Sequence, residues 1–182
     1  MAKLFSEILP ALREFIERQH IFFTASAAAG SRVNVSPRGA DALRVLGPNW
    51  VAYLDQTGSG NETAAHMRAD GRLTIMFCAF VGAPTILRLY GRGRSVPRGT
   101  AEYAELLGTS FNGEESPGAR QIVVQEIDLV QTSCGYGVPL FDHVGERDTL
   151  KQWATRQGEE GLVEYRRAKN AVSIDGLRAG IE

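Results

Sequence analysis

The amino-acid sequence predicts a mainly-β domain in which an antiparallel barrel carries helices on its outside. Short apolar runs follow one another closely, and turns rich in Gly, Pro and Asn separate them. Strands and helices do not alternate regularly, which argues against a doubly wound parallel sheet. The expected strands cover residues 21–25, 32–36, 42–46, 50–54, 73–80, 85–96 and 121–130.

Four further segments carry helical character. Apolar residues between Leu4 and Ile16 recur at helical spacing, with charged residues opposite them. Pro10 interrupts this pattern, so the helix either begins near Ser6, with the proline close to its first turn, or kinks at the proline. The other helices are expected at residues 61–70, at 100–107 and in a charged tail from residue 147 onward.

Composition indicates one ordinary soluble domain that spans residues 1–182. The chain has 43% hydrophobic and 23% charged residues, and its formal net charge of -1 provides no field that would favour nucleic acid or an anionic membrane. The two cysteines lack the spacing of a zinc site or a disulfide framework, so we expect no metal and a cytoplasmic location. No apolar run approaches the ~20 residues that a bilayer requires, so we expect no membrane partner.

Residues 51–66 are the most informative stretch, because an apolar strand ends there in a glycine turn that opens onto a helix. Gly60 lets the backbone approach a ligand closely, and Ser59, Asn61 and Thr63 place short polar groups where helix N–H donors are unpaired. This arrangement suits an anion, although no Walker loop is present. The same residue types are also common helix caps, so both interpretations stay open.

A second polar group is expected at the end of the strand in residues 33–39. Alternation places Asn34 and Ser36 on one face, while Pro37 is expected to end the pairing. Arg38 at the following turn either binds a phosphate by charge-assisted hydrogen bonds or lies in solvent.

Two further patterns each allow a ligand-binding and a structural interpretation. Arginines and a tyrosine share one face of residues 87–94 and either face a ligand or pair with acidic residues, while alternating glycines indicate close packing, for example by a partner chain. Tyr136 lies between two glycines, so its ring either contacts a flat ligand or another subunit, or anchors a loop. Cys134 has no recognised nucleophile motif, and thiol catalysis is not expected.

Taken in order, these segments resemble the FMN-binding split-barrel proteins related to pyridoxamine 5'-phosphate oxidase. The resemblance implies a six-stranded antiparallel split barrel, usually a homodimer, with one FMN in each of two clefts between the subunits. It is carried by residues 33–39, 51–55, 57–63, 76–80, 87–92 and 133–139, and by the tail at 164–167 and 170–177.

Position by position, the resemblance also implies cofactor contacts. The strand end and the glycine turn would hold the FMN phosphate and ribityl chain, the residues from Tyr53 to Asp55 would run under the flavin ring, and a glycine–tyrosine pair would approach the ring from the same or the partner subunit. The residues concerned are Asn34, Ser36, Arg38, Tyr53, Leu54, Asp55, Ser59, Gly60, Asn61, Thr63, Gly135 and Tyr136.

The chain also departs from the oxidase itself. The closing Arg-x-His-x-Arg and Arg-Leu-x-Pro segments of the oxidase are missing, so oxidation of pyridoxamine phosphate is not expected. Asn61 and Glu62 stand where the oxidase has an Arg-Lys pair on its phosphate. Because Glu62 would repel a phosphate, Arg38 or an arginine from the row at residues 88–94 should compensate for it.

The function expected from the resemblance is that of an FMN-dependent oxidoreductase acting on an unknown small molecule. A deazaflavin-dependent reductase and a non-catalytic flavin- or haem-binding or sensing protein are the alternatives. No residue stands out as a proton donor or base, so no catalytic residue is predicted; redox chemistry of this kind belongs to the cofactor.

Overall fold

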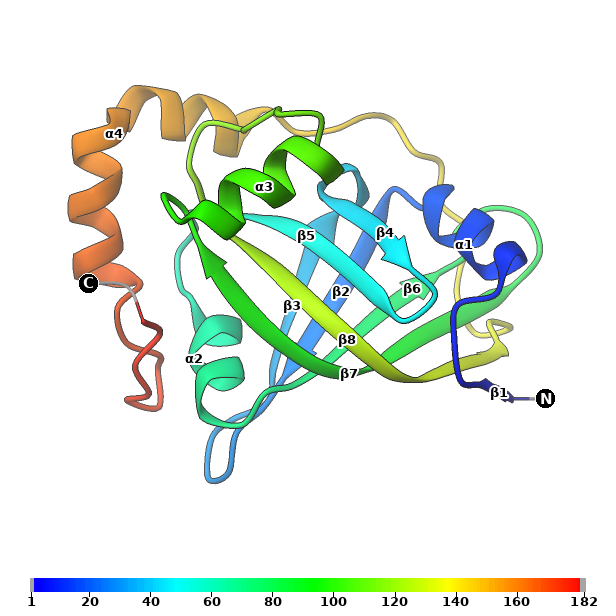
Figure 1. Cartoon of the computed structure of the whole chain (residues 1–182). Helices are drawn as coiled ribbons and strands as arrows, with labels where there is room; N and C mark the ends of the chain where they lie inside the picture. The colour runs from blue at the N-terminus through cyan, green and yellow to red at the C-terminus, as the bar shows by residue number, and fades with distance from the viewer. Residues whose placement is uncertain (1, 181–182) are drawn as a thin grey trace.

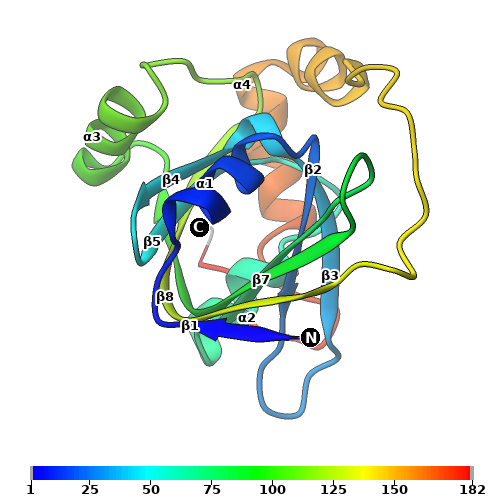
Figure 2. The same cartoon turned by 90° about the vertical axis from the view of Figure 1, so that its right-hand side faces the viewer.

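The computed structural model describes residues 2–180, and one curled antiparallel sheet dominates it (Figures 1 and 2). The strands follow the order β3-β2-β6-β7-β8-β5-β4, and β1 pairs with the far end of β8. The mainly-β class and the antiparallel split-barrel architecture are therefore confirmed. The strands are β1 (Lys3–Phe5), β2 (Ile21–Ser26), β3 (Asn34–Gly39), β4 (Leu43–Gly47), β5 (Trp50–Gln56), β6 (Arg72–Cys78), β7 (Thr85–Pro97) and β8 (Ala119–Cys134).

The described sheet has eight strands, two more than the resemblance implied. One reason is the three-residue strand β1, which occupies residues that the sequence pattern assigned to the first helix. That helix begins instead at Pro10, where a proline is favourable because the first helical N–H has no partner within the helix. The helices are α1 (Pro10–Glu17), the short 3-10 turn η1 (Ala40–Ala42), α2 (Glu62–Ala69), α3 (Ala101–Ser110) and α4 (Thr149–Lys169).

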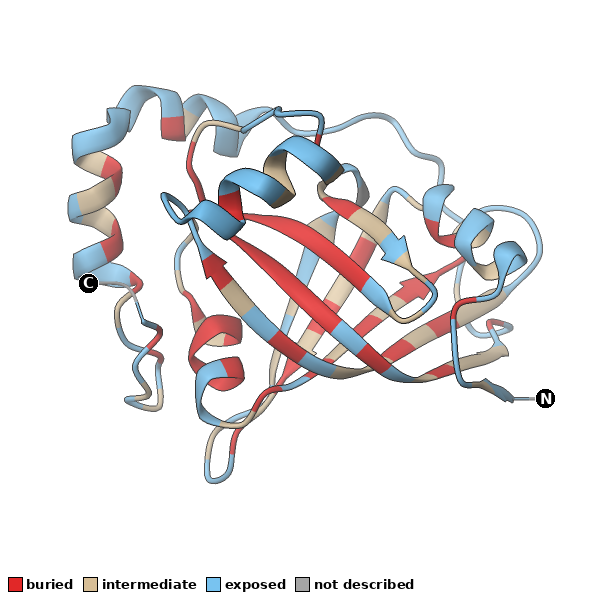
Figure 3. Ribbon diagram, in the orientation of Figure 1, coloured by how far each residue is buried: buried red, intermediate tan, exposed pale blue. Residues whose placement is uncertain are grey.

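Apolar side chains fill the inside of the curl. Phe22 on β2 lies at the centre of the main core, with its ring 5.5 Å from that of Tyr53 and 5.9 Å from that of Phe77. A second cluster packs α3 against β5 and β8, and Figure 3 shows these two strands buried along most of their length. Both clusters depend on the alternation of side chains along each strand, which is clearest in β2.

Pro37 lies inside β3, opposite Phe23, so the expectation that it ends the pairing is wrong. Strand β3 stands at one end of the strand order and therefore has a free edge. A proline is tolerated there because it removes an N–H that no neighbouring strand uses. Pairing continues to Gly39, so Arg38 lies within the strand and not on a turn.

The alternating glycines of β7 meet neighbours within the same chain, so the suggestion of a partner chain is not needed to explain them. A Cβ atom at Gly91 would lie 1.9 Å from the backbone oxygen of Glu126 on β8, where the register shifts. A Cβ atom at Gly93 would lie 2.5 Å from Sδ of Met67 on α2. These glycines let the sheet and α2 approach β7 closely.

We expect Gly91→Ala to lower the free energy of unfolding by about 1–3 kcal/mol, since the added methyl group overlaps backbone that cannot move independently. Chemical denaturation monitored by circular dichroism would measure the change. Gly108→Ala is the matched control: Gly108 lies in helix α3 with open space around it, so alanine there should stabilise the protein by about 0.5–1 kcal/mol. Equal stability of the two variants would contradict the close approach at Gly91.

Beyond β8 the chain leaves the sheet. Residues 135–148 run along the side of the barrel to α4, as Figure 2 shows. Helix α4 is kinked at Gly158, which has a φ of 66°, and residues 170–180 return toward α2, where Ala179 packs on Ala64 and Ala65. No helix in residues 2–180 has both the length and the apolar character of a membrane span.

Candidate functional site

A polar cavity of about 640 Å³ opens between the edge strand β3, the turn after β5 and the first turn of α2. Two segments that are distant in the sequence thus meet, and a hydrogen bond of 3.1 Å from Asn34 Nδ2 to Thr63 Oγ1 joins them. Most of the cofactor contacts expected from the sequence line this cavity: Asn34, Ser36, Arg38, Leu54, Ser59, Gly60, Asn61 and Thr63.

Asp55 is the buried centre of the charge network beside this cavity. Only 1% of the residue is exposed, and its carboxylate accepts hydrogen bonds from Arg38, from Arg120 Nε at 2.7 Å and from Gln121 Nε2 at 2.7 Å. Burial acts to raise the pKa of Asp55, but the charges of Arg38 and Arg120, with the hydrogen bonds from Arg120 and Gln121, outweigh burial and hold the pKa below its usual range. Asp55 is therefore ionised and fixes both guanidinium groups.

Arg38 is the cation that links this network to the cavity. Its side chain is 19% exposed, its Nε donates to Thr24 Oγ1 at 3.3 Å, and its Cζ lies 4.9 Å from the centre of the Tyr53 ring. Burial acts to lower the pKa of Arg38, but Tyr53 and Asp55 raise it, and the net change is upward. Arg38 thus stays charged and keeps one edge accessible from the cavity.

Tyr53 belongs to the core and does not line the cavity. It is 1% exposed, and burial raises its pKa to about 12, so the phenol is neutral under ordinary conditions. Its position on β5 explains this placement: Leu54, the next residue, points to the opposite face and reaches the cavity. Contact between Tyr53 and a flavin ring stays a prediction.

Residues that lie far along the chain hold the glycine turn between β5 and α2 in place by hydrogen bonds. Arg120 Nη1 donates to the Gly60 carbonyl oxygen at 3.0 Å and to Asn170 Oδ1 at 2.8 Å. Asn170 Nδ2 donates in turn to the Gly58 carbonyl oxygen at 3.0 Å. Arg166 Nε donates to Thr57 Oγ1 at 2.8 Å. The turn is thus fixed before any ligand binds.

Asn61 occupies the N-cap position of α2, but its side chain makes no capping hydrogen bond. Its Oδ1 accepts from Gln121 Nε2 at 3.1 Å, and its buried Nδ2 has no hydrogen-bond partner among the residues that the structure describes. A buried donor without an acceptor is costly, so a bound acceptor would stabilise this arrangement. Together with the unpaired N–H groups of the first helical turn, it favours the anion-binding interpretation over simple capping.

Glu62 also lines the cavity, but its carboxylate is directed toward the C-terminal segment, where both oxygens accept from the Ile174 N–H at 3.2 Å. The arginine row on β7 does not compensate for it. Arg94 pairs with Glu102, and Arg92 donates to the Asp70 carbonyl oxygen at 2.5 Å. Of the arginines that the sequence offered for this role, Arg38 lines the cavity and no arginine of the row does.

Several cavity residues were not predicted. Arg120 lies just before the strand expected at residues 121–130, and it is only 8% exposed because β8 begins at Ala119 and pairs with β5. Arg147 and Lys151 reach the cavity from the segment before α4 and from its first turn. Their basic character was visible in the sequence, but nothing local indicated that the chain returns to this side of the barrel.

Gly135 and Tyr136 lie away from the polar cavity within one chain. A Cβ atom at Gly135 would meet backbone at the start of β7, and Tyr136 is 82% exposed. Their contact with a cofactor stays a prediction that requires a second subunit.

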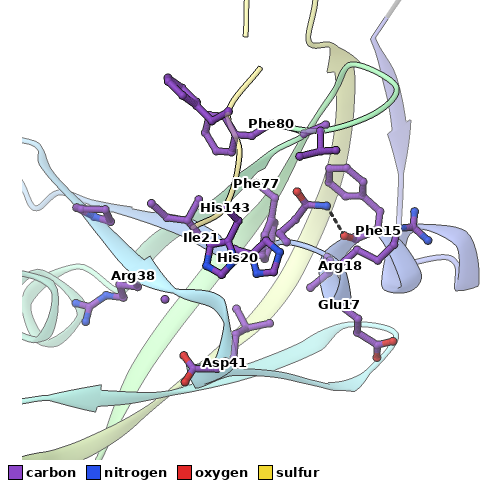
Figure 4. Close-up of a pocket in the computed structure, with 18 of the residues that line it drawn as sticks. Phe15, Glu17, Arg18, His20, Ile21, Arg38, Asp41, Phe77, Phe80 and His143 are labelled. Atoms are coloured by element: carbon purple, nitrogen blue, oxygen red, sulfur yellow. Dashed lines mark hydrogen bonds between the residues drawn. The ribbon is translucent and has the colours of Figure 1, made fainter. Parts of the chain in front are cut away.

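A larger groove of about 1500 Å³ adjoins the polar cavity. Figure 4 shows Ile21, Phe77 and Phe80 around it, with Arg38 and Asp41 at its edge. The two spaces share one stretch of β3 and part of the segment before α4: Pro37, Arg38, Gly39, Asp41, Glu146 and Arg147. A ligand with a charged end and a flat apolar part would fit such a continuous space.

Comparison with known proteins gives a consistent result. The family model described as pyridoxamine 5'-phosphate oxidase matches residues 8–134. The pyridoxamine 5'-phosphate oxidase family protein ustO of Aspergillus flavus is 37% identical over an alignment of 184 positions. The alignment covers 91% of this chain and 73% of that protein.

Solved structures agree in fold. A candidate pyridoxamine 5'-phosphate oxidase of Lactobacillus delbrueckii superposes with a TM-score of 0.54 at 17% identity, covering 69% of this chain and 98% of the other. A variant of HupZ from Group A Streptococcus gives a TM-score of 0.52 at 15% identity, covering 69% and 99%. At these identities the superpositions support the fold alone.

Proposed function

Because the chain belongs to the pyridoxamine 5'-phosphate oxidase family, we propose that it is an FMN-binding flavoprotein, and that it acts as an oxidoreductase on a small molecule. The observation that carries the proposal is the polar cavity, in which Asn61 presents a buried donor without a partner among the described residues. The apolar groove beside it supports the same conclusion, since a flavin nucleotide has a charged end and a flat ring.

The residues around the cavity fit a phosphate and a polyol chain. The first turn of α2, with Asn61 and Thr63, offers N–H and O–H donors to phosphate oxygens. Asn34 and Ser36 on β3 offer groups that both donate and accept, which suits ribityl hydroxyls. Arg38 and Lys151 supply positive charge, which a phosphate requires next to Glu62.

The bound flavin would supply the electron and hydride transfer itself. The chain's own residues bind and orient it. Asp55 fixes Arg38, Arg120 fixes the glycine turn through Gly60, and the apolar walls of the groove exclude water from the ring. No described residue acts as an essential acid or base in this proposal, because hydride transfer depends on distance and orientation.

We also propose a homodimer, with the cofactor near the interface. Large apolar side chains are exposed on β3 and on the segment after β8, and such residues commonly mark protein contacts when they cluster. They are Val33, Val35, Tyr136, Leu140 and Phe141, with exposed fractions of 70%, 61%, 82%, 73% and 60%. Light scattering on the purified protein, with the bound flavin counted per chain, tests whether the protein is a dimer.

A cytoplasmic location is a further proposal, supported by the two free cysteines.

The direct test of the function is to purify the protein, denature it and identify the released compound by mass and absorption. FMN is expected, and reduction of the bound flavin by NADH or NADPH would support turnover, whereas reduction by dithionite alone would show only that the flavin is accessible. Release of a deazaflavin or haem would replace the cofactor assignment. A yellow protein that none of these reductants can reduce would favour a storage or sensing role.

We expect Asn61→Ala to weaken FMN binding about 10- to 100-fold, which corresponds to the loss of one hydrogen bond of about 1.5–3 kcal/mol to a charged group. Riboflavin lacks the phosphate, so its affinity should change much less. Titrations that follow quenching of flavin fluorescence would measure both ligands, and the ratio of the two affinities is the informative quantity.

Thr109→Ala, at an exposed position on α3 away from the cavity, serves as the control and should leave both affinities unchanged. If Asn61→Ala weakened FMN and riboflavin equally, Asn61 would not contact the phosphate. An unchanged FMN affinity would show that the phosphate lies elsewhere.

A further inference from the structure

Three metal-ligating side chains meet in the large groove, where Glu146 borders the polar cavity as well. His20 lies between α1 and β2, whereas His143 and Glu146 belong to the segment that links β8 to α4. One donor atom from each lies within 4.8 Å of the others, and all three residues are exposed. Figure 4 shows the two imidazole rings side by side in the groove.

The three donors lie close enough together to share an ion after a change of side-chain rotamer. The rings of His20 and His143 are 3.8 Å apart and within 3° of parallel, and His143 Nε2 lies 3.0 Å from Glu146 Oε1. Ligands at about 2.0–2.2 Å from one zinc-class ion lie within about 4.4 Å of one another. The nitrogen lone pairs lie in the ring planes, so the two stacked rings would have to turn out of their stack before all three donors could bind one ion.

Two carboxylates, one of them that of Glu146, would also favour a bound cation. A Cβ atom placed on Gly39 would lie 3.1 Å from Asp41 Oδ1 and 3.6 Å from Glu146 Oε2, so two carboxylates converge over this glycine. Within residues 2–180, neither has a lysine or arginine at ion-pair distance, and Glu146 pairs only with His143. Like charges held together in this way repel each other unless a positive charge lies between or beside them.

We propose that His20, His143 and Glu146 bind a divalent transition-metal ion of the zinc class. Two imidazoles with one carboxylate are typical ligands of such ions, whereas Mg²⁺ and Ca²⁺ prefer all-oxygen sites. Three protein ligands leave a coordination position open to the groove, which Asp41 also lines.

The ion would attach residues 135–148 to the rim of the barrel beside the flavin cavity. The sequence prediction of no metal considered cysteine spacing, and His20 lies too far from His143 and Glu146 in the chain for the three to form a local motif. The site does not depend on FMN, so its test can fail or succeed independently of the proposed function.

The experiment uses the full-length protein stripped of metal with a chelator and titrated with Zn²⁺ by calorimetry. We expect one ion per chain. Co²⁺ is the second probe, because visible absorption bands stronger than those of the hydrated ion report direct ligation in a four- or five-coordinate site. Absence of saturable Zn²⁺ binding, or a Co²⁺ spectrum identical to that of the hydrated ion, would overturn the proposal.

His143→Ala and Glu146→Gln change an exposed segment and should leave the fold intact. Each should weaken Zn²⁺ binding about 100-fold or more, since changes to groups that merely support metal ligands already cost about 10–100-fold. Glu105→Gln, at an exposed position on α3, is the matched control and should bind Zn²⁺ as the unmodified chain does. Binding that survives both His143→Ala and Glu146→Gln would show that the ion sits elsewhere, and the pair would then be only a surface contact.

Discussion

Asp55→Asn is expected to lower the free energy of unfolding by about 3–5 kcal/mol, the usual effect of removing one partner from a buried ion pair. The carboxylate is 1% exposed and forms ion pairs with both Arg38 and Arg120. Asparagine has nearly the same shape, so the loss comes from charge and not from packing. It leaves two guanidinium groups without their anion, and its own amide N–H group would face donors. Urea denaturation at neutral pH measures the change.

The same variant gives a pH test whose sign follows from the lowered pKa of Asp55. The folded pKa lies below the unfolded value of about 3.9, so the stability that Asp55 contributes is fully present above pH ~4 and is lost as the pH falls through the folded pKa. The difference between the unmodified protein and Asp55→Asn should therefore be largest at neutral pH and shrink in acid. Asp128→Asn, at an exposed position on β8, should change stability by less than about 0.5 kcal/mol. A difference for Asp55→Asn that is independent of pH would contradict the ionised state.

Much of the fold could be read from the sequence, because its signals are local. Alternation along β7 and the glycine turn before α2 are each contained within a few residues, and the structure has both elements close to their expected positions. The prediction of secondary structure failed where the position of neighbouring strands determined which structure formed. Residues 3–5 became β1 because β8 offers them a strand edge, and Pro37 stays within β3 because that strand is itself an edge.

The small polar residues of the candidate site could be predicted from the sequence, but its buried charged residues could not. Asn34, Asn61 and Thr63 stand at strand and helix ends, where local reasoning expects ligand groups. No local sequence pattern indicates the role of Arg120, because that role depends on the Asp55 carboxylate, 65 residues away in the chain. Contacts of this kind become visible only when the pairing of β5 with β8 is known.

Asn170→Leu is the second large effect expected, because Asn170 connects the C-terminal segment to the cavity. The residue is fully buried, accepts from Arg120 Nη1 and donates to the Gly58 carbonyl oxygen. Leucine leaves the buried Arg120 guanidinium and the half-buried Gly58 carbonyl oxygen without this partner, at about 1–3 kcal/mol each, so we expect a loss of about 2–5 kcal/mol in the free energy of unfolding. Denaturant titration measures this loss.

Comparing Asn170→Leu with Asn170→Asp separates the two hydrogen bonds. Aspartate still accepts from Arg120 but cannot donate to Gly58, so its stability should fall between those of Asn170→Leu and the unmodified chain, and its glycine turn should be only partly loosened. FMN affinity should follow the same order, because that turn leads directly into the first turn of α2. If stability fell in Asn170→Leu while FMN affinity stayed constant, the C-terminal segment would support the fold without shaping the cavity. A parallel loss of both would show that residues beyond the matched family region at 8–134 help to form the site.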